Sequence, residues 1–268
     1  MTGVGLLMIL FTGSVSANEA NPSGSDAGLA QDLTNPLADL ITVPIQMNVD
    51  RNIGPGDKGR KIQTNIQPVY PVYLTEDWNM ITRTILPVID QKEIFAGAGS
   101  QFGLGDATIS LFVSPRKSTS SGIIWGVGPV FYLPTATDRL LGAEKWGAGP
   151  TAVCLTMRGP WTLGALGNHV WSYAGDSGRP DLNNTFVQPF AAYTWPSGWT
   201  ASIQSEASYN WRSDQWSLPL NVAAAKLVWL GRLPVSLSAG IGYWLESPAT
   251  GPEGFRFRLQ ANFVLPKP

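Results

Sequence analysis

The stretch from Gly105 to Ser114 shows a hydrophobic pattern that recurs along most of the chain. From Ala107 to Val113 every second residue is aliphatic, and the positions between are mostly hydroxyls, preceded by Asp106. Side chains alternate between the two faces of a β-strand, so this stretch has one apolar face and one mostly polar face. The pattern predicts a strand that separates two unlike media.

The same period of two predicts twelve strands of about 10 to 13 residues, long enough to cross a bilayer when tilted. An even number of strands returns the two ends of the set to the same side. The expected strands cover residues 40–50, 62–74, 78–88, 105–114, 123–133, 147–157, 161–173, 183–194, 199–211, 218–229, 235–244 and 255–263.

The connections between these strands differ systematically in length. Those after the even-numbered strands are short turns, whereas those after the odd-numbered strands are longer, apart from the connection after the ninth. Transmembrane barrels have short periplasmic turns and long external loops. The fold class predicted is therefore all-β, a closed antiparallel up-and-down transmembrane β-barrel, with a soluble sandwich or barrel as the alternative.

Tryptophan placement agrees with a membrane barrel. Ten indoles lie at or just beyond predicted strand ends, where they can form girdles at the two membrane interfaces, and Trp125 lies near a strand start. The ten are Trp78, Trp146, Trp161, Trp171, Trp195, Trp199, Trp211, Trp216, Trp229 and Trp244.

Composition excludes several classes of function. Charged residues make up 14% of the chain, the formal net charge is −1, and there is no basic block, so nucleic acid is not an expected partner. The mean hydropathy of +0.01 is too low for a bundle of membrane helices. Cys154, the single cysteine, lies among aliphatic residues and is expected to be a buried, inert thiol. No metal-ligand spacing occurs, and no cofactor is expected.

The region before the first strand divides in two. Residues 1–17 resemble a secretory signal peptide, with an apolar core and a small-residue cleavage site at Val15-Ser16-Ala17. Residues 18–39 form a periplasmic lead-in in which Leu29, Leu33 and Leu37 could occupy one or two amphipathic turns, interrupted by Pro36. This lead-in either enters the barrel mouth or is a disordered linker. Residues 40–268 are assigned to the barrel.

Polar residues on the expected interior faces are the candidate functional residues. The expected pore-lining set is Asp50, Arg83, Asp106, Gln188, Gln204, Glu206, Arg256 and Arg258. The first and last strands must pair to close a barrel, which brings Asp50 to the level of Arg256 and Arg258 and predicts contact across the seam. The charges either line an open pore or neutralise one another in a filled interior.

His169, the single histidine, and Ser172 suggest a lipid hydrolase, because outer-membrane phospholipase A is a twelve-stranded barrel with a His/Ser pair on its outer wall. Residues three apart on a regular strand point to opposite faces, however, so the pair could form only if the strand contains a bulge. We expect His169 to lie at the membrane interface beside Trp171, and no catalytic residue is assigned.

Several motifs resemble the outer-membrane β-barrel family labelled "MetA-pathway of phenol degradation". They are G-L-G-D at 103–106, Y-L-P-T-A-T at 132–137, K-W at 145–146, N-H-V-W-S-Y-A-G at 168–175 and Q-P-F at 188–190. The resemblance covers the chain from about Asn35 onward. It implies a transporter of small molecules, aromatic or hydrophobic ones included, in the bacterial outer membrane. The C-terminus, which ends Pro266-Lys267-Pro268 after Phe263, departs from the aromatic ending typical of such barrels.

The sequence therefore predicts an outer-membrane channel for passive uptake of small molecules and no enzymatic activity. Its expected partners are outer-membrane lipid, a small-molecule solute and the barrel-assembly machinery. A phospholipase A-type lipid hydrolase and a purely structural barrel are the alternatives.

Overall fold

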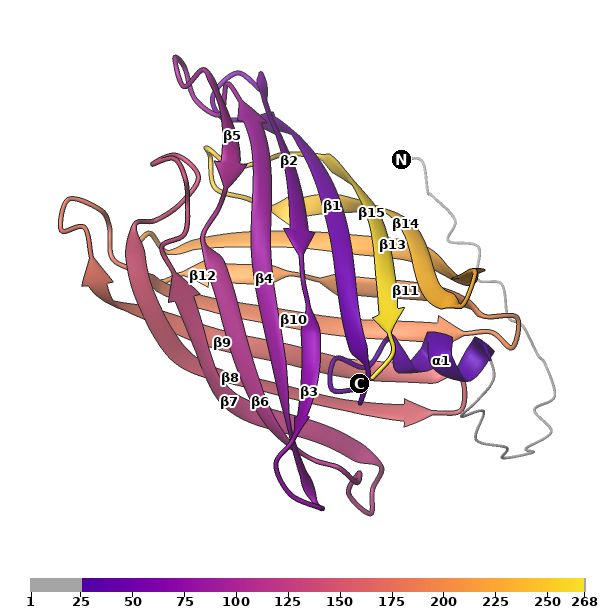
Figure 1. The fold of residues 1–268 in the computed structure, drawn as a ribbon. Helices are drawn as coiled ribbons and strands as arrows, with labels where there is room; N and C mark the ends of the chain where they lie inside the picture. The colour runs from indigo at the N-terminus through magenta and orange to yellow at the C-terminus, as the bar shows by residue number, and fades with distance from the viewer. Residues whose placement is uncertain (1–25, 268) are drawn as a thin grey trace, which may run out of the picture.

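One antiparallel sheet closes on itself in the computed structural model, which describes residues 26–267 (Figure 1). The signal peptide expected at residues 1–17 lies outside the described residues. The elements in chain order are α1 (Asp26–Asp32), β1 (Ile41–Ile53), β2 (Gly59–Ile66), β3 (Val69–Tyr73), β4 (Trp78–Lys92), β5 (Ser100–Leu104), β6 (Ala107–Pro115), β7 (Ile123–Leu133), β8 (Lys145–Arg158), β9 (Trp161–Gly175), β10 (Asn183–Thr194), β11 (Trp199–Ser205), β12 (Ala207–Asn210), β13 (Gln215–Leu230), β14 (Leu233–Glu246) and β15 (Phe255–Leu265).

These fifteen segments form the twelve antiparallel strands predicted from the sequence, because three strands are interrupted. The segments β2 and β3 form one strand, as do β5 with β6 and β11 with β12. Pro68 lies between β2 and β3, where it removes a backbone donor. The interruption between β11 and β12 falls at Glu206. The neighbouring strands β10 and β13 carry Pro189 and Pro219, and a proline has no backbone N–H to pair with the adjacent strand.

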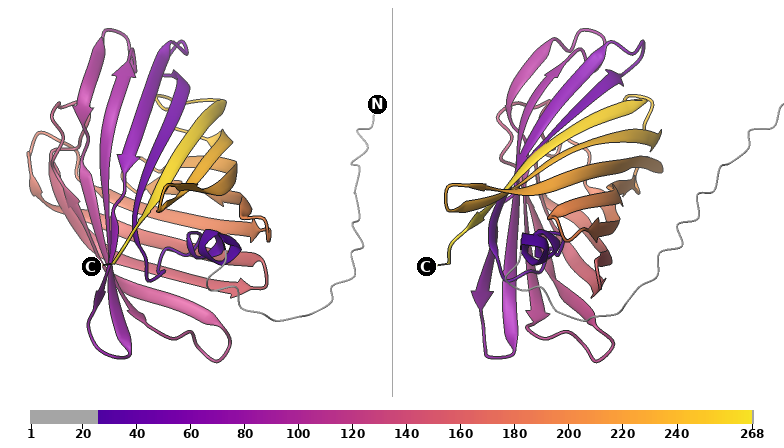
Figure 2. Two further views of the ribbon diagram at one scale, coloured as in Figure 1. Left: turned by 45° about the vertical axis from the view of Figure 1, so that its right-hand side comes forward. Right: turned by 90° about the vertical axis from the view of Figure 1, so that its right-hand side faces the viewer.

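The first and last strands close the barrel. β1 pairs with β15 from Ile41 opposite Leu265 to Val49 opposite Phe257, without a register shift. Figures 1 and 2 show β1 in indigo beside β15 in yellow, so the two ends of the sheet meet. A closed sheet has no unpaired edge, which allows strands to cross lipid without unsatisfied backbone groups.

The apolar faces of most strands form the outer wall. In β15, Phe257 and Leu259 are exposed on the outside, whereas Arg256 and Arg258 are buried toward the interior. Nine of the eleven indoles are exposed, all except Trp125 and Trp244. An apolar wall with exposed aromatics near the strand ends is what a lipid-facing barrel presents. No helix within residues 26–267 is long and apolar enough to cross a membrane.

Strand β8 differs from this rule and corrects two expectations. Its apolar residues Val153 and Leu155 are buried inside the barrel, whereas apolar faces were expected to meet lipid. Cys154 between them is exposed on the outer wall, so the expectation of a buried thiol is wrong. The reason is that the lumen contains an apolar segment of its own, which the β8 side chains contact.

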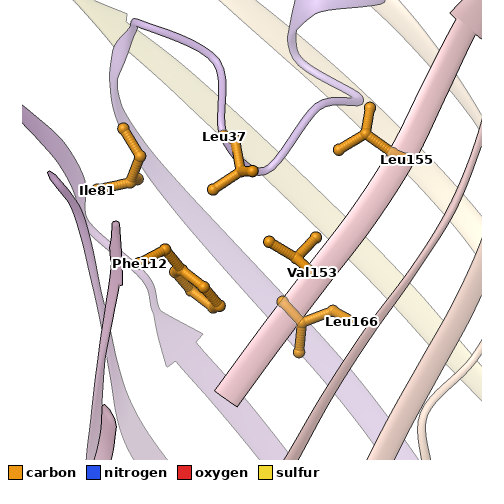
Figure 3. Close-up of a cluster of buried hydrophobic side chains, with 6 residues drawn as sticks. All are labelled: Leu37, Ile81, Phe112, Val153, Leu155 and Leu166. Atoms are coloured by element: carbon orange, nitrogen blue, oxygen red, sulfur yellow. The ribbon is translucent and has the colours of Figure 1, made fainter. Parts of the chain in front are cut away.

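That segment is the stretch between α1 and β1. Leu37 is 7% exposed and lies among Ile81, Phe112, Val153, Leu155 and Leu166, which point to it from the barrel wall (Figure 3). Upstream, the Gln31 side chain donates to the Gly159 carbonyl oxygen at 2.7 Å, and the Thr34 hydroxyl donates to the Thr162 hydroxyl at 2.8 Å. These contacts hold the chain at the turn between β8 and β9 and against the inner wall. We call residues 26–40, α1 included, the luminal segment.

Candidate functional site

Asp50 and Arg256 meet across the seam between β1 and β15. Arg256 Nε lies 3.2 Å from Asp50 Oδ1, and Nη2 donates to Oδ2 at 3.2 Å. The Arg256 and Asp50 side chains are 8% and 2% exposed. Trp244 Nε1 also donates to Asp50 Oδ1, at 2.9 Å, and its ring lies under the Arg256 guanidinium. The structure thus contains the seam contact expected from the sequence.

Glu206 joins the same group from a strand three positions away in the sheet. Its Oε2 accepts a hydrogen bond from Arg258 Nη2 at 2.6 Å and lies 3.6 Å from Arg256 Nη1. Arg258 Nε also donates to Asn48 Oδ1 at 2.7 Å. Because β13 and β14 separate Glu206 from β15 in the sheet, these contacts cross the interior and do not follow the wall.

Two further cations lie close to these groups. Lys61 pairs in register with Asp50 and interacts electrostatically with both Asp50 and Arg256. Arg83 interacts electrostatically with Glu206, and its Nη2 donates to Gln67 Oε1 at 2.8 Å. We call the six residues Asp50, Lys61, Arg83, Glu206, Arg256 and Arg258 the lumen cluster.

A cavity of about 260 Å³ lies between the lumen cluster and the luminal segment. Arg83, Arg258 and Glu206 contribute to its lining, and the luminal segment contributes residues from Ala30 to Leu40. Gln188 and Gln204 also line it, and Gln188 Nε2 donates to Gln204 Oε1 at 2.9 Å. Five of the eight residues expected to line a pore therefore border this cavity. Asp50 and Arg256 lie in the cluster beside it.

Asp106 behaves differently from the other expected residues. Its two carboxylate oxygens accept hydrogen bonds from the backbone N–H groups of Ala136 and Ala143, at 3.0 and 2.6 Å. Both donors belong to the connection between β7 and β8, which also carries the Thr135 hydroxyl that bonds Gly105 and Ala107. Asp106 therefore anchors a loop, and its carboxylate does not line the cavity.

Sequence reasoning missed three contributors to the interior. Lys61 was placed in a turn, because β2 begins earlier than expected, at Gly59. Trp244 was expected in an interfacial girdle, but its side chain faces the interior. The alternation with Tyr243, which faces outward, already indicated this direction in the sequence. Leu37 was recognised as apolar, but nothing local indicated which wall it would contact.

The external rim of the barrel is tied by ion pairs. Asp181 contacts Lys145 Nζ at 2.9 Å and Arg212 Nη2 at 2.8 Å, and it accepts a hydrogen bond from Ser172. The hydrogen bond from Lys145, followed by that from Ser172, holds the pKa of Asp181 below its usual value. These contacts join the connection after β9 to β8 and to the turn after β12.

The luminal segment is tied to the C-terminus where it enters β1. Asp39 Oδ2 lies 2.6 Å from Lys267 Nζ and accepts a hydrogen bond from the Tyr73 hydroxyl at 2.8 Å. Burial opposes ionisation of Asp39, but the hydrogen bonds from Lys267 and Tyr73 outweigh it and lower the pKa of Asp39. Burial raises the pKa of Asp32, which lines the cavity at the end of α1.

His169 and Ser172 do not form a catalytic pair. His169 lies beside Trp171, with ring centroids 4.0 Å apart, and its Nδ1 is 2.7 Å from the Thr185 hydroxyl. Ser172 instead bonds Asp181 and the backbone of Leu182. Within residues 26–267, no three His, Cys, Asp or Glu side chains come together in an arrangement that could hold a metal ion.

Lys226, whose direction the sequence left open, points outward. Its ammonium lies 5.8 Å from the centre of the Trp199 ring and donates to the Ser197 carbonyl oxygen in the turn between β10 and β11. The long side chain thus reaches from the wall toward the polar end of the barrel, as lysines near a membrane interface do.

Known structures share the fold, although no protein-family model and no curated protein sequence matches the chain. The COG4313 outer membrane channel from Pseudomonas putida F1 is similar, with a TM-score of 0.67 and 16% identity over 85% of this chain and 97% of that one. Outer membrane phospholipase A from Escherichia coli has a TM-score of 0.51 and 10% identity over 91% and 99%. At these identities the likeness shows the fold, a closed barrel of the outer-membrane type. With its lipid-facing wall, this fold places the chain in a bacterial outer membrane.

Proposed function

We propose that the protein is a passive channel that admits small molecules across the outer membrane. The observation that carries this proposal is the polar, charged interior of an otherwise apolar barrel. Side chains that only had to fill the barrel would be expected to be apolar, whereas here charged groups and amides border a cavity inside the barrel. The similarity to a structure described as an outer membrane channel supports the same function.

The solute is proposed to be small and to include aromatic or hydrophobic compounds. The motifs that resemble the barrel family labelled "MetA-pathway of phenol degradation" suggest this class. The apolar side chains in the cavity lining, Leu33, Leu40 and Phe190 among them, support it, because they give an apolar solute a surface to contact inside the lumen. The luminal segment narrows the path, so a solute must pass between this segment and the wall.

Single-channel recording on refolded protein in a planar bilayer tests this function. A channel gives discrete conductance steps, and the ion selectivity shifts when Glu206 is replaced by alanine, because Glu206 is a carboxylate of the lumen. A structural barrel gives no steps even when its heat-modifiable gel mobility shows that it is folded. That result, repeated with the luminal segment removed, would contradict the proposal.

A lipid hydrolase is the second candidate, and the site geometry does not favour it. The His169 imidazole bonds Thr185 on the neighbouring strand, and no carboxylate or amide of residues 26–267 forms a hydrogen bond with its other nitrogen. We therefore expect His169→Ala to leave channel conductance unchanged. Release of fatty acid from phospholipid vesicles by the wild-type protein, lost in His169→Ala, would revive the hydrolase.

A further inference from the structure

The lumen cluster carries more positive than negative charge. Lys61, Arg83, Arg256 and Arg258 are cationic, and only Asp50 and Glu206 oppose them. The two carboxylates bind Arg256 and Arg258, so both acidic groups are already engaged. Within residues 26–267, neither Arg83 nor Lys61 has a carboxylate oxygen within 4 Å. The charges of the lumen cluster therefore do not neutralise one another.

Asp32 reduces this excess but does not remove it. Its carboxyl borders the same cavity from the luminal segment. Burial raises the pKa of Asp32, and Arg83 is not among the causes of that shift. The lumen cluster together with Asp32 contains four cations and three anions. Asp106, another buried carboxylate of the interior, lies away from the cavity and is engaged by backbone N–H groups of the loop between β7 and β8. Charge held away from bulk water is costly unless it is compensated, so an anion from solution is the natural complement.

Arg83 is the cation best placed to receive such an anion. It is half-buried on β4 and borders the cavity, and among residues 26–267 its side chain has only the Gln67 amide as a hydrogen-bond partner. A guanidinium has five N–H groups arranged as a planar fork that fits a carboxylate. The contact with Gln67 orients the group while leaving N–H groups for a ligand. Arg258 Nη1, buried and without a partner, adds positive potential nearby.

We propose that the cavity is a binding site for small organic carboxylates, with the carboxylate on Arg83 and the hydrocarbon part directed toward the luminal segment. This inference rests on the proposed channel function and names its solute class. Glutamine side chains at positions 188 and 204 offer further polar contacts. A cavity of about 260 Å³ is smaller than the roughly 300–1,000 Å³ of sites for drug-sized ligands, which limits the solute to about one ring.

Three probes of nearly equal shape and different charge test the site: benzoate, neutral benzamide and cationic benzamidine. Chloride current through single channels is measured while each probe is added. We expect benzoate to reduce the current at a concentration at least about tenfold below that needed for benzamide, which corresponds to about 1.4 kcal/mol, and benzamidine to be the weakest. Arg83→Gln should abolish the preference for benzoate, and Arg83→Lys should retain part of it.

The matched control is Arg60→Gln, which removes the same charge from an exposed position on β2. It should leave the preference unchanged. Equal block by benzoate and benzamide in the wild-type channel, or an unchanged preference in Arg83→Gln, would overturn the inference while leaving the channel function intact.

Calorimetric titration of the refolded protein in detergent keeps the two proposals separable. Absence of conductance would contradict the channel function, and titration would then still decide the site. Binding of benzoate that exceeds binding of benzamide and disappears in Arg83→Gln supports the site. Equal heats for the two probes overturn it.

Discussion

Asp50 and Arg256 form an ion pair, with Nε and Oδ1 3.2 Å apart, across the seam where the first and last strands of the barrel meet. The pair joins residues that are 206 positions apart in the chain, and Trp244 supports it with a hydrogen bond to the same carboxylate. Pairing of β1 with β15, which closes the barrel, therefore brings Asp50 and Arg256 together, although these two residues belong to different hairpins.

Breaking this pair from one side should destabilise the closed barrel. Asp50→Asn removes the nearer of the two carboxylates that contact the buried Arg256, and loss of one partner of a buried ion pair costs about 3–5 kcal/mol. Urea titration of the protein in lipid vesicles, followed by the heat-modifiable gel shift, measures the change. The double variant Asp50→Asn with Arg256→Gln should recover part of the loss. Equal destabilisation by the double and single variants would show that the charges do not interact favourably.

Removing the Leu37 side chain should loosen the luminal segment. Leu37 is buried among five apolar side chains of the wall, and truncation of a buried leucine to alanine costs about 2–5 kcal/mol. The lost free energy weakens the binding of the luminal segment to the wall and not the pairing of the strands, because the barrel closes without contacts from Leu37. We expect Leu37→Ala to raise single-channel conductance while the unfolding midpoint of the barrel changes little. Unchanged conductance with a lowered midpoint would instead make Leu37 part of the barrel core.

Two glycines on β7 should respond differently to an added methyl group. A Cβ at Gly128 would lie 1.9 Å from the backbone oxygen of Leu111, whereas a Cβ at Gly126 would lie 3.2 Å from the Leu37 side chain. A backbone atom in a paired strand cannot move aside cheaply, so Gly128→Ala should destabilise the barrel by about 1–3 kcal/mol or prevent refolding. Gly126→Ala should refold normally, because a side chain can shift. Refolding yield measured by gel mobility compares them.

Acid should release the ion pairs at the external rim. The pKa of Asp181 is lowered in the folded protein, so its contacts are fully present above the usual value of 3.8 and are lost as the pH falls below that value through the folded pKa. Current fluctuations from loop motion should therefore increase as the pH is lowered through this window. Asp181→Asn should show the increase already at pH 7. A wild-type record that stays quiet in acid would rule out this role.

Cys154 offers a direct test of which face meets lipid. A nitroxide label on this single thiol, exposed on the outer wall, should collide often with oxygen, which concentrates in bilayers, and rarely with a water-soluble nickel complex. Electron paramagnetic resonance saturation in vesicles measures both. A label attached at Val153→Cys, with Cys154→Ser in the same chain, faces the lumen and provides the comparison. Frequent nickel collisions at Cys154 would place that face in water.

Local pattern determines a large part of this protein. Alternation of apolar and polar residues suffices to locate all twelve strands, because the two sides of a membrane barrel contact media of opposite polarity. The same alternation assigns Arg83, Glu206, Arg256 and Arg258 to the interior. Pairing of the first and last strands follows from closure, and with it the meeting of Asp50 and Arg256.

Only the tertiary structure decided what the interior contains. Val153 and Leu155 point inward because they pack on Leu37, which lies in the lumen but belongs to none of the strands. Cys154, between them, is therefore exposed on the outer wall. The alternation of residues along a strand shows which face is apolar, but it does not show whether that face contacts lipid or another segment of the protein. The excess of cations in the lumen cluster emerges in the same way, because Glu206 is shared between two arginines that reach it across the lumen. Contacts across an enclosed space depend on barrel width and side-chain reach, which neighbouring residues in the chain do not encode.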